Sequence, residues 1–352
     1  MTVSAKLPEN DKVLAVVFGL PGPCTGKTAE ALQSIARIAR RECVTAEVNS
    51  IDDWQAACEM DESVIVLSPF PSLEVSAHIS SIGIPALVVL NSPLDAVALL
   101  VALEHSDTSA VRAVSASVSC LSEKLFQDRI SIRTSNAENL DAFVTRLAAG
   151  LASDVSAFDL NRLESLITEL STLNDALDRK LPLALTGNLS SLASAVLPTA
   201  DHDPDLDEGV KIDWPGSLFL LGDSPDTPMH GSVDLSGPAR CVLYGPYMHL
   251  PAGAWTASVA VGLADCLGER SFTLEVVCRE VIAKGRFHCR GSGTFNTRLD
   301  FQHRHPDVPI ELRLFLDAGE IYGSVTKFDV SLQSSAVKES DLAITLPMDL
   351  AG

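Results

Sequence analysis

The period of the hydrophobic pattern changes along the chain, and this change constrains the fold more than any single motif. Before about residue 150, short aliphatic runs alternate with helical patterns; the predicted strands are 13–18, 64–67 and 85–90, and the predicted helices are 29–40 and 92–103. Continuous aliphatic strands separated by helices are typical of a parallel sheet covered on both faces. The first part of the chain is therefore predicted to be an α/β domain.

From Trp214 onward the hydrophobic period is two. Apolar residues alternate with small or polar ones in segments 255–263, 272–278, 310–316 and 328–332. This is the pattern of half-buried antiparallel strands. Turns containing glycine or proline separate these segments, with no long helical pattern among them, so the last third is predicted to be an all-β sandwich of the jelly-roll type.

These patterns divide the chain into six segments: a flexible N-terminus (1–11), the α/β domain (12–152), a helical segment (153–200), an acidic linker (201–212), the β-sandwich (213–334) and a C-terminal tail (335–352). The helical segment carries a leucine seam, Leu163, Leu166, Leu170, Leu173 and Leu177. The seam covers only about two heptads, which favours packing within the chain over a coiled coil.

Charge and hydropathy exclude several classes of function. The chain has 26 Lys and Arg against 46 Asp and Glu, a formal net charge of −20, so we expect no nucleic-acid partner. The longest apolar runs, 13–20 and 96–103, are shorter than the roughly 18 to 20 residues that cross a bilayer, and residues 1–11 lack a secretory-signal pattern. We therefore expect a cytoplasmic protein without a membrane span, whose eight cysteines are reduced and mostly buried.

A glycine loop follows the first predicted strand directly. It runs from Gly19 to Thr28 with the sequence GLPGPCTGKT and leads into the helical pattern 29–40. Such a loop surrounds a phosphate with backbone amides at a helix N-terminus and adds a lysine ammonium and a hydroxyl. The residues predicted to bind a phosphate or a nucleotide are Gly22, Thr25, Gly26, Lys27, Thr28 and Asp95.

The loop departs from the full phosphate-binding motif in two ways. Pro21 stands where the motif has its first glycine, and the strand 64–67 ends in Ser68 rather than in the aspartate of a nucleotide hydrolase. We therefore expect no magnesium site there. The alternative interpretation is a turn that only links the strand to the helix.

A second motif, Asn91-Ser92-Pro93-Leu94-Asp95, follows the predicted strand 85–90. Together with the first loop it resembles the sulfotransferase branch of the P-loop fold, over about residues 12–152. That family has Pro-basic-Ser-Gly-Thr-Thr where this chain has residues 23–28, and Arg-Asn/Asp-Pro-x-Asp where it has residues 91–95. Pro93 and Asp95 match, whereas Asn91 replaces the arginine that holds the 3′-phosphate of the donor and Leu99 replaces a serine.

The resemblance implies a P-loop-like parallel sheet. Because both donor contacts are changed and no general base is evident, it also implies a catalytically impaired relative. We assign no catalytic residue, and the only cofactor considered is a nucleotide.

The sandwich contains a distinctive segment in which Tyr244-Gly245-Pro246-Tyr247 precedes Leu250-Pro251-Ala252-Gly253. It resembles carbohydrate-binding-like β-sandwich domains of bacterial proteins linked to surface-polysaccharide synthesis, over residues 213–334. The apolar face of a sugar ring stacks on aromatic side chains, while its hydroxyls need fixed polar partners. The residues predicted to contact a glycan are Tyr244, Tyr247, Trp255 and Arg286. The alternatives are a core position for Trp255 and, for the two tyrosines, closure of one end of the sandwich.

No metal site is predicted. His303 and His305 would share a face of a strand, but a third ligand is missing, and the carboxylates of 201–209 surround Leu206 where a calcium loop has glycine.

Three functions remain. The first is an accessory or regulatory protein of bacterial exopolysaccharide production, with a glycan or polysaccharide-synthesis proteins as partners. The second is an active nucleotide-dependent sulfo- or phosphotransferase acting on a glycan, and the third is a structural protein-interaction module. The sequence leaves the formation of a homo-oligomer open.

Overall fold

A computed structural model describes residues 12–121 (with gaps at 23–24, 27, 30–31, 34–35, 37–41, 83, 85 and 91–92), 130–133 and 210–334. They belong to two compact units. The described residues before 134 form the first unit together with Tyr247–Pro251 and His305–Ile310, and the remaining described residues form the second. The predicted helical segment, most of the acidic linker and the C-terminal tail lie outside the described residues.

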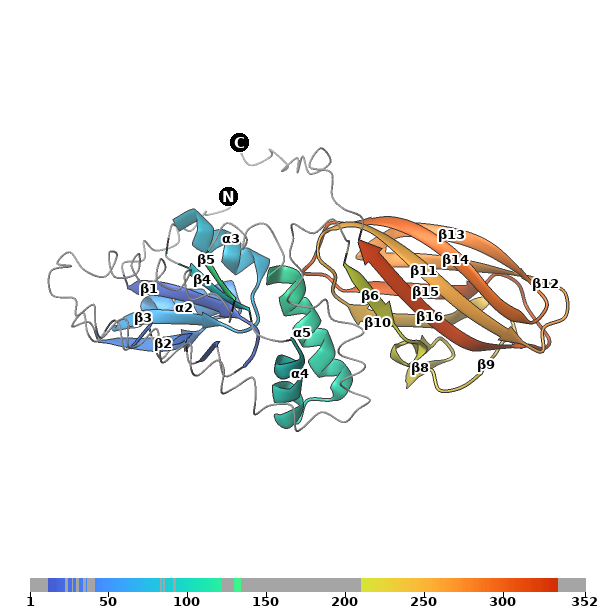
Figure 1. The fold of residues 1–352 in the computed structure, drawn as a ribbon, viewed down its shortest axis with the longest axis horizontal. Coiled ribbons are helices and arrows are strands. Elements are labelled where there is room, and N and C mark those ends of the chain that lie inside the picture. Colours follow the sequence, from blue (N-terminus) through green and yellow to red (C-terminus); the bar gives the residue numbers. More distant parts are fainter. Residues whose placement is uncertain are drawn as a thin grey trace, which may run out of the picture. The chain divides into compact units, whose positions relative to one another are not determined.

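The first unit contains a five-stranded parallel sheet (Figure 1). Its strands are β1 (Val13–Gly19), β2 (Cys43–Glu47), β3 (Ser63–Ser68), β4 (Ala86–Leu90) and β5 (Ile130–Arg133), in the order β2-β3-β1-β4-β5. Every residue of the central strand β1 is buried. This burial agrees with the continuous aliphatic run expected of a parallel strand that is covered on both faces.

The described helices of this unit are α2 (Ile51–Glu59), α3 (Leu73–Ile82), α4 (Pro93–Ala102) and α5 (Asp107–Leu121). Helix α4 matches the predicted helix 92–103, but the sequence patterns missed the other three helices and β2. In α5 the reason is that several buried positions are serines, Ser115, Ser117 and Ser119, so the apolar period is weak.

The second unit is a β-sandwich, as the period-two pattern predicted. Its six-stranded sheet has the order β13-β12-β15-β10-β7-β8, and its five-stranded sheet has β14-β11-β16-β6 with β9 paired to β16. The strands are β6 (Lys211–Trp214), β7 (Leu220–Leu221), β8 (Ser224–Pro228), β9 (Val233–Asp234), β10 (Arg240–Met248), β11 (Gly253–Ala264), β12 (Glu269–Cys278), β13 (Glu280–Arg290), β14 (Gly293–His303), β15 (Ile310–Leu316) and β16 (Ser324–Ser334), and η2 (Gly216–Leu218) follows β6.

The two sheets enclose an apolar core. Trp214, Trp255, Phe272 and Phe328 are each at most 2% exposed, and the Phe219 and Phe328 rings meet edge to face at 4.7 Å. Because successive residues of a strand point to opposite faces, burial of one alternate set directs the other set outward. On the sandwich's five-stranded sheet, the outward set forms the outer face of β14, β11, β16 and β6.

Candidate functional site

Small side chains line the outer face of the five-stranded sheet along β11. The residues that alternate with its inward-facing positions are Ala254, Thr256, Ser258, Ala260 and Gly262, and none is larger than threonine; Ser258 is exposed, Ala254 and Ala260 are half-buried, and Thr256 and Gly262 lie buried between the neighbouring side chains. They span eight residue steps, or about 27 Å at about 3.4 Å per residue. The middle of this sheet therefore has a long, low floor.

Longer polar side chains flank this floor on both sides. Thr256 pairs with Asp300 of β14 and Gln333 of β16, and Ser258 pairs with Arg298 and Ser331. The flanking residues are Asn296, Arg298, Asp300 and Gln302 on β14, and Lys327, Asp329, Ser331 and Gln333 on β16. We call the floor and these two flanks the β11 groove.

At one end the β11 groove includes an open hollow of about 420 Å³, lined by Ala254, Trp255, Thr256, Arg298, Asp300, Phe301 and Gln302. The Thr256 hydroxyl donates to Asp300 Oδ1 at 2.6 Å, and Arg298 Nη2 donates to Thr256 Oγ1 at 3.2 Å. Arg298 Nε lies 3.4 Å from Asp300 Oδ1. These contacts fix donor and acceptor atoms beside a space that is open to solvent.

The hydrogen bond from Thr256 holds the pKa of Asp300 below its usual value, and Arg298 lowers it further. Asp300 is therefore a carboxylate, a pure hydrogen-bond acceptor, at neutral pH. The Arg298 and Asp300 side chains are 68% and 73% exposed, and ion pairs this exposed contribute little to stability because solvent screens them. The fold gains little from this arrangement, which is consistent with a role in binding.

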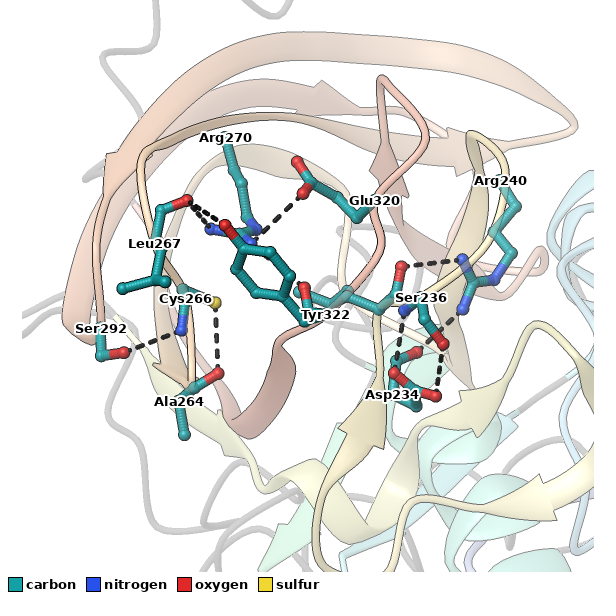
Figure 2. Close-up of polar contacts among 11 residues, drawn as sticks. Asp234, Ser236, Arg240, Ala264, Cys266, Leu267, Arg270, Ser292, Glu320 and Tyr322 are labelled. Atoms are coloured by element: carbon teal, nitrogen blue, oxygen red, sulfur yellow. Dashed lines mark hydrogen bonds and ion pairs between the residues drawn. The ribbon is translucent and has the colours of Figure 1, made fainter.

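A second polar cluster joins two connections of the sandwich, the turn 265–268 and the loop 317–323 (Figure 2). Arg270, 2% exposed, pairs with Glu320 at 3.2 Å and donates to the carbonyls of Leu267 at 3.3 Å and Tyr322 at 3.1 Å. Its guanidinium also lies over the Tyr322 ring, 5.3 Å from the centroid. Since Arg270 is almost fully buried, this cluster supports the two connections from inside and offers no open polar site.

For Trp255 the sequence left two interpretations, contact with a glycan and a position in the core. Trp255 is 2% exposed, which agrees with the core position. Tyr244 of β10 is half-buried, and its hydroxyl accepts a hydrogen bond from the Asp226 amide at 3.4 Å. Tyr247, near the end of β10 and in the segment Tyr247–Pro251 that is grouped with the first unit, is half-buried, and the Arg112 guanidinium lies 5.4 Å from its ring centroid.

Arg286 is exposed on β13, and its Nε lies 3.0 Å from Asp317 Oδ2. Its strand belongs to the six-stranded sheet, as does the strand of Tyr244, but β12 and β15 lie between them. Trp255 belongs to the other sheet. The four residues predicted to contact a glycan therefore do not come together on one face.

The residues predicted to bind phosphate follow β1, except for Asp95. The Thr25 hydroxyl is buried and donates to the Leu20 carbonyl at 2.7 Å, and the Gly26 amide approaches the Gly22 carbonyl at 3.5 Å. Thr25, Gly26 and Thr28 are helical, and Asp95 is in the first turn of α4. Lys27 lies outside the described residues.

The loop after β1 and the start of α4 after β4 lie at the same edge of the sheet, because β1 and β4 are parallel neighbours. The sheet therefore brings the predicted phosphate-binding residues toward one edge.

Sequence reasoning did not identify the β11 groove as a site, although it named one residue of the β14 flank, Asp300, among the possible polar partners of a sugar. The alternation 255–263 identified the buried face of β11, and its outward partners were treated only as small or polar. The flank on β14 was harder to find, since Thr297 and His303 interrupt the apolar alternation of the inward positions in that strand. A signal was available in the row of small residues at 254, 256, 258, 260 and 262.

Among the described residues, no group of three or more His, Cys, Asp or Glu side chains is arranged to hold a metal ion, and His303 is buried whereas His305 is exposed. None of the helices in the described ranges is long and apolar enough to span a membrane.

Comparison with known proteins gave matches among solved structures only. No protein-family model matches the chain, and no curated protein matches it. An arabinose-bound α-L-arabinofuranosidase, MgGH51, is 15% identical with a TM-score of 0.24; the match covers 34% of this chain and 23% of the enzyme, less than a quarter of its length.

Two carbohydrate-binding modules are among the other matches. A CBM36 module in complex with calcium and xylotriose is 14% identical over 33% of this chain and 96% of the module, with a TM-score of 0.25. The C-terminal family 22 module of Clostridium thermocellum Xyn10B is 13% identical over 39% of this chain and 100% of the module, with a TM-score of 0.22. These values do not assign the chain to a family.

Proposed function

We propose that this protein binds a glycan without transforming it, and that the β11 groove is the binding surface. The observation that carries the proposal is the open hollow of about 420 Å³ on a floor of small residues, beside the fixed polar groups of Thr256, Arg298 and Asp300. Sugar hydroxyls both donate and accept hydrogen bonds. The Asp300 carboxylate accepts, the Arg298 guanidinium donates, and the amides of Gln302 and Gln333 do both.

We further propose that the protein is an accessory or regulatory component of bacterial exopolysaccharide production. The support for this role is the resemblance of residues 213–334 to sandwich domains of surface-polysaccharide proteins. Its partners would be the glycan itself and proteins of polysaccharide synthesis.

The glycan-binding proposal is tested by filling the floor of the groove. Ser258 is exposed between Arg298 and Ser331, so Ser258→Trp places a bulky ring where the ligand would lie. The control is Ser224→Trp, the same change at an exposed position of β8 in the other sheet. The readout is binding of the full chain to beads that carry a coupled β-glucan, xylan, galactomannan or dextran.

We expect the wild type and Ser224→Trp to bind at least one polymer alike, and Ser258→Trp to lose about tenfold or more in affinity, equivalent to about 1.4 kcal/mol. Equal binding by both variants, or no binding by the wild type, would contradict the proposal.

A second candidate function, binding of a nucleotide or another phosphate compound, is favoured by the topology of the first unit. In the order β2-β3-β1-β4-β5, the connection after β1 leads to β2 at one edge of the sheet, whereas the connection after β3 leads to β4 on the other side of β1. The direction of the connections therefore reverses between the neighbouring strands β1 and β3. Open α/β sheets bind ligands outside the carboxyl ends of their strands at such a reversal. The loop that contains Gly22, Thr25 and Gly26 begins at that point.

The test of this candidate is a thermal-shift screen with ATP, GTP and adenosine 3′,5′-bisphosphate, with and without magnesium. A ligand that binds the native state raises the melting temperature, and we expect Lys27→Ala to remove that rise. Turnover of a sulfo or phospho donor that is lost in Lys27→Ala would favour the transferase alternative. The absence of a shift with every compound would leave the loop as a structural turn.

A further inference from the structure

The charged residues of the β11 groove and of the neighbouring strand β6 occur as ion pairs with the same spacing in the sequence. In each pair the basic residue precedes the acidic residue by two positions on the same strand, so both point to the outer face. The pairs are Arg298–Asp300 at 3.4 Å, Lys327–Asp329 at 3.2 Å and Lys211–Asp213 at 3.5 Å. Each of the six side chains is about half exposed or more.

The strand register alternates the signs of these charges across the groove as well. One row across the sheet runs from Asp300 through Thr256 and Gln333 to Lys211. The next row runs from Arg298 through Ser258 and Ser331 to Asp213. A charged group on a ligand would therefore meet both signs wherever it lay on this face.

The sandwich as a whole is also close to neutral. Residues 210–334 contain 11 lysines and arginines and 14 aspartates and glutamates, a net charge of −3, whereas the whole chain carries −20. The long-range field of the protein is thus negative and would repel a polyanion. The face of the groove offers no excess of positive charge to overcome that repulsion.

The outward positions of β14, β11, β16 and β6 contain no aromatic residue. Contacts on this face are therefore made by hydroxyls, amides and paired charges, which bind through hydrogen bonds. From the paired charges, the sign alternation and the length of the floor, we infer that the ligand of the β11 groove is an uncharged polysaccharide segment that lies along β11. This inference rests on the proposed glycan-binding function and specifies its substrate class.

The test compares neutral and anionic polymers on beads, with the full chain. The neutral polymers are β-glucan, galactomannan and dextran, and the anionic polymers are alginate and polygalacturonate. Binding is measured at about 0.01 M and about 0.15 M salt, between which the Debye length falls from about 30 Å to about 8 Å. We expect binding to at least one neutral polymer, with a change in affinity below about twofold between the two salt concentrations, and no binding to either anionic polymer.

Two matched triple variants test the pairing itself. The first variant replaces the acidic residues Asp213, Asp300 and Asp329 by asparagine, a side chain of nearly the same shape, and leaves three unpaired cations. The second variant replaces the basic residues Lys211, Arg298 and Lys327 by glutamine and leaves three unpaired anions. Since three acidic charges are removed and three cations are left unpaired, the asparagine variant is expected to gain about tenfold or more in affinity for alginate at low salt. The glutamine variant is expected to gain none.

The outcomes separate the two proposals. Tighter binding of the wild type to alginate or polygalacturonate than to every neutral polymer would overturn the inference and leave glycan binding intact. So would a loss of about tenfold or more in affinity for the neutral polymer on raising the salt. Binding of the wild type to no polymer of either class would overturn the proposed function and this inference together.

Discussion

Glu320→Gln is expected to destabilise the sandwich strongly, because it removes the charge that faces the buried Arg270. The two side chains are 3.2 Å apart, with Arg270 1% and Glu320 19% exposed. Coulomb's law at this distance gives about 5 kcal/mol for an effective dielectric constant of about 20. Measured costs of removing one partner from a buried pair are about 3 to 5 kcal/mol. Because Glu320 keeps some contact with water, we expect about 3 kcal/mol.

The remaining contacts of Arg270 do not compensate for this loss. Its guanidinium keeps the carbonyls of Leu267 and Tyr322 and the Tyr322 ring, all of which are uncharged (Figure 2). Its Nε has no hydrogen-bond partner among the described residues. A buried cation with only neutral acceptors is the costly state that the carboxylate prevents.

The assay is urea unfolding followed by tryptophan fluorescence, with free energies from linear extrapolation. A Trp54→Phe background makes the signal specific to the sandwich, since the other two tryptophans, Trp214 and Trp255, lie in its core. The matched control is Glu269→Gln, at a 63% exposed carboxylate opposite His288, which is expected to cost less than about 0.5 kcal/mol. A loss below about 1 kcal/mol for Glu320→Gln would refute the reasoning.

Three further perturbations have defined outcomes. Thr256→Val removes the main cause of the lowered Asp300 pKa, so carboxyl NMR titration should show that pKa closer to its ordinary value. The stability that this carboxylate contributes is present above its unfolded pKa of about 3.9 and lost as the pH falls through its lower folded pKa, so acid unfolding of Thr256→Val should show a weaker dependence on pH in that range. Trp255→Ala should cost about 3 to 5 kcal/mol in urea unfolding, because it empties a core position; unchanged stability with loss of glycan binding would instead restore the stacking role. Gly323→Ala should cost about 1 to 3 kcal/mol, because its φ is +108° and the new Cβ would lie 2.8 Å from the Cys266 sulfur; a melting temperature equal to that of the wild type would contradict this.

The sequence determined where most of the apolar strands lie. The runs 13–18, 64–67 and 85–90 became β1, β3 and β4, and the alternating segments became β11, β12, β15 and β16 with small shifts at their ends. The period of hydrophobicity is a local property, because it reflects which faces of a segment are covered. It therefore distinguished a parallel sheet from a sandwich without any knowledge of strand order.

The pattern did not determine which strands are neighbours, and the candidate site depends on that. Thr256 and Asp300 are 44 residues apart in the chain, and Gln333 is farther still, yet they form one row of the sheet. The tyrosine motif that pointed to a glycan site lies in β10 of the other sheet, and Trp255 faces the core. Strand pairing and the face of each side chain are set by packing between distant segments, so only the tertiary structure placed the row of small residues on β11 between two polar flanks.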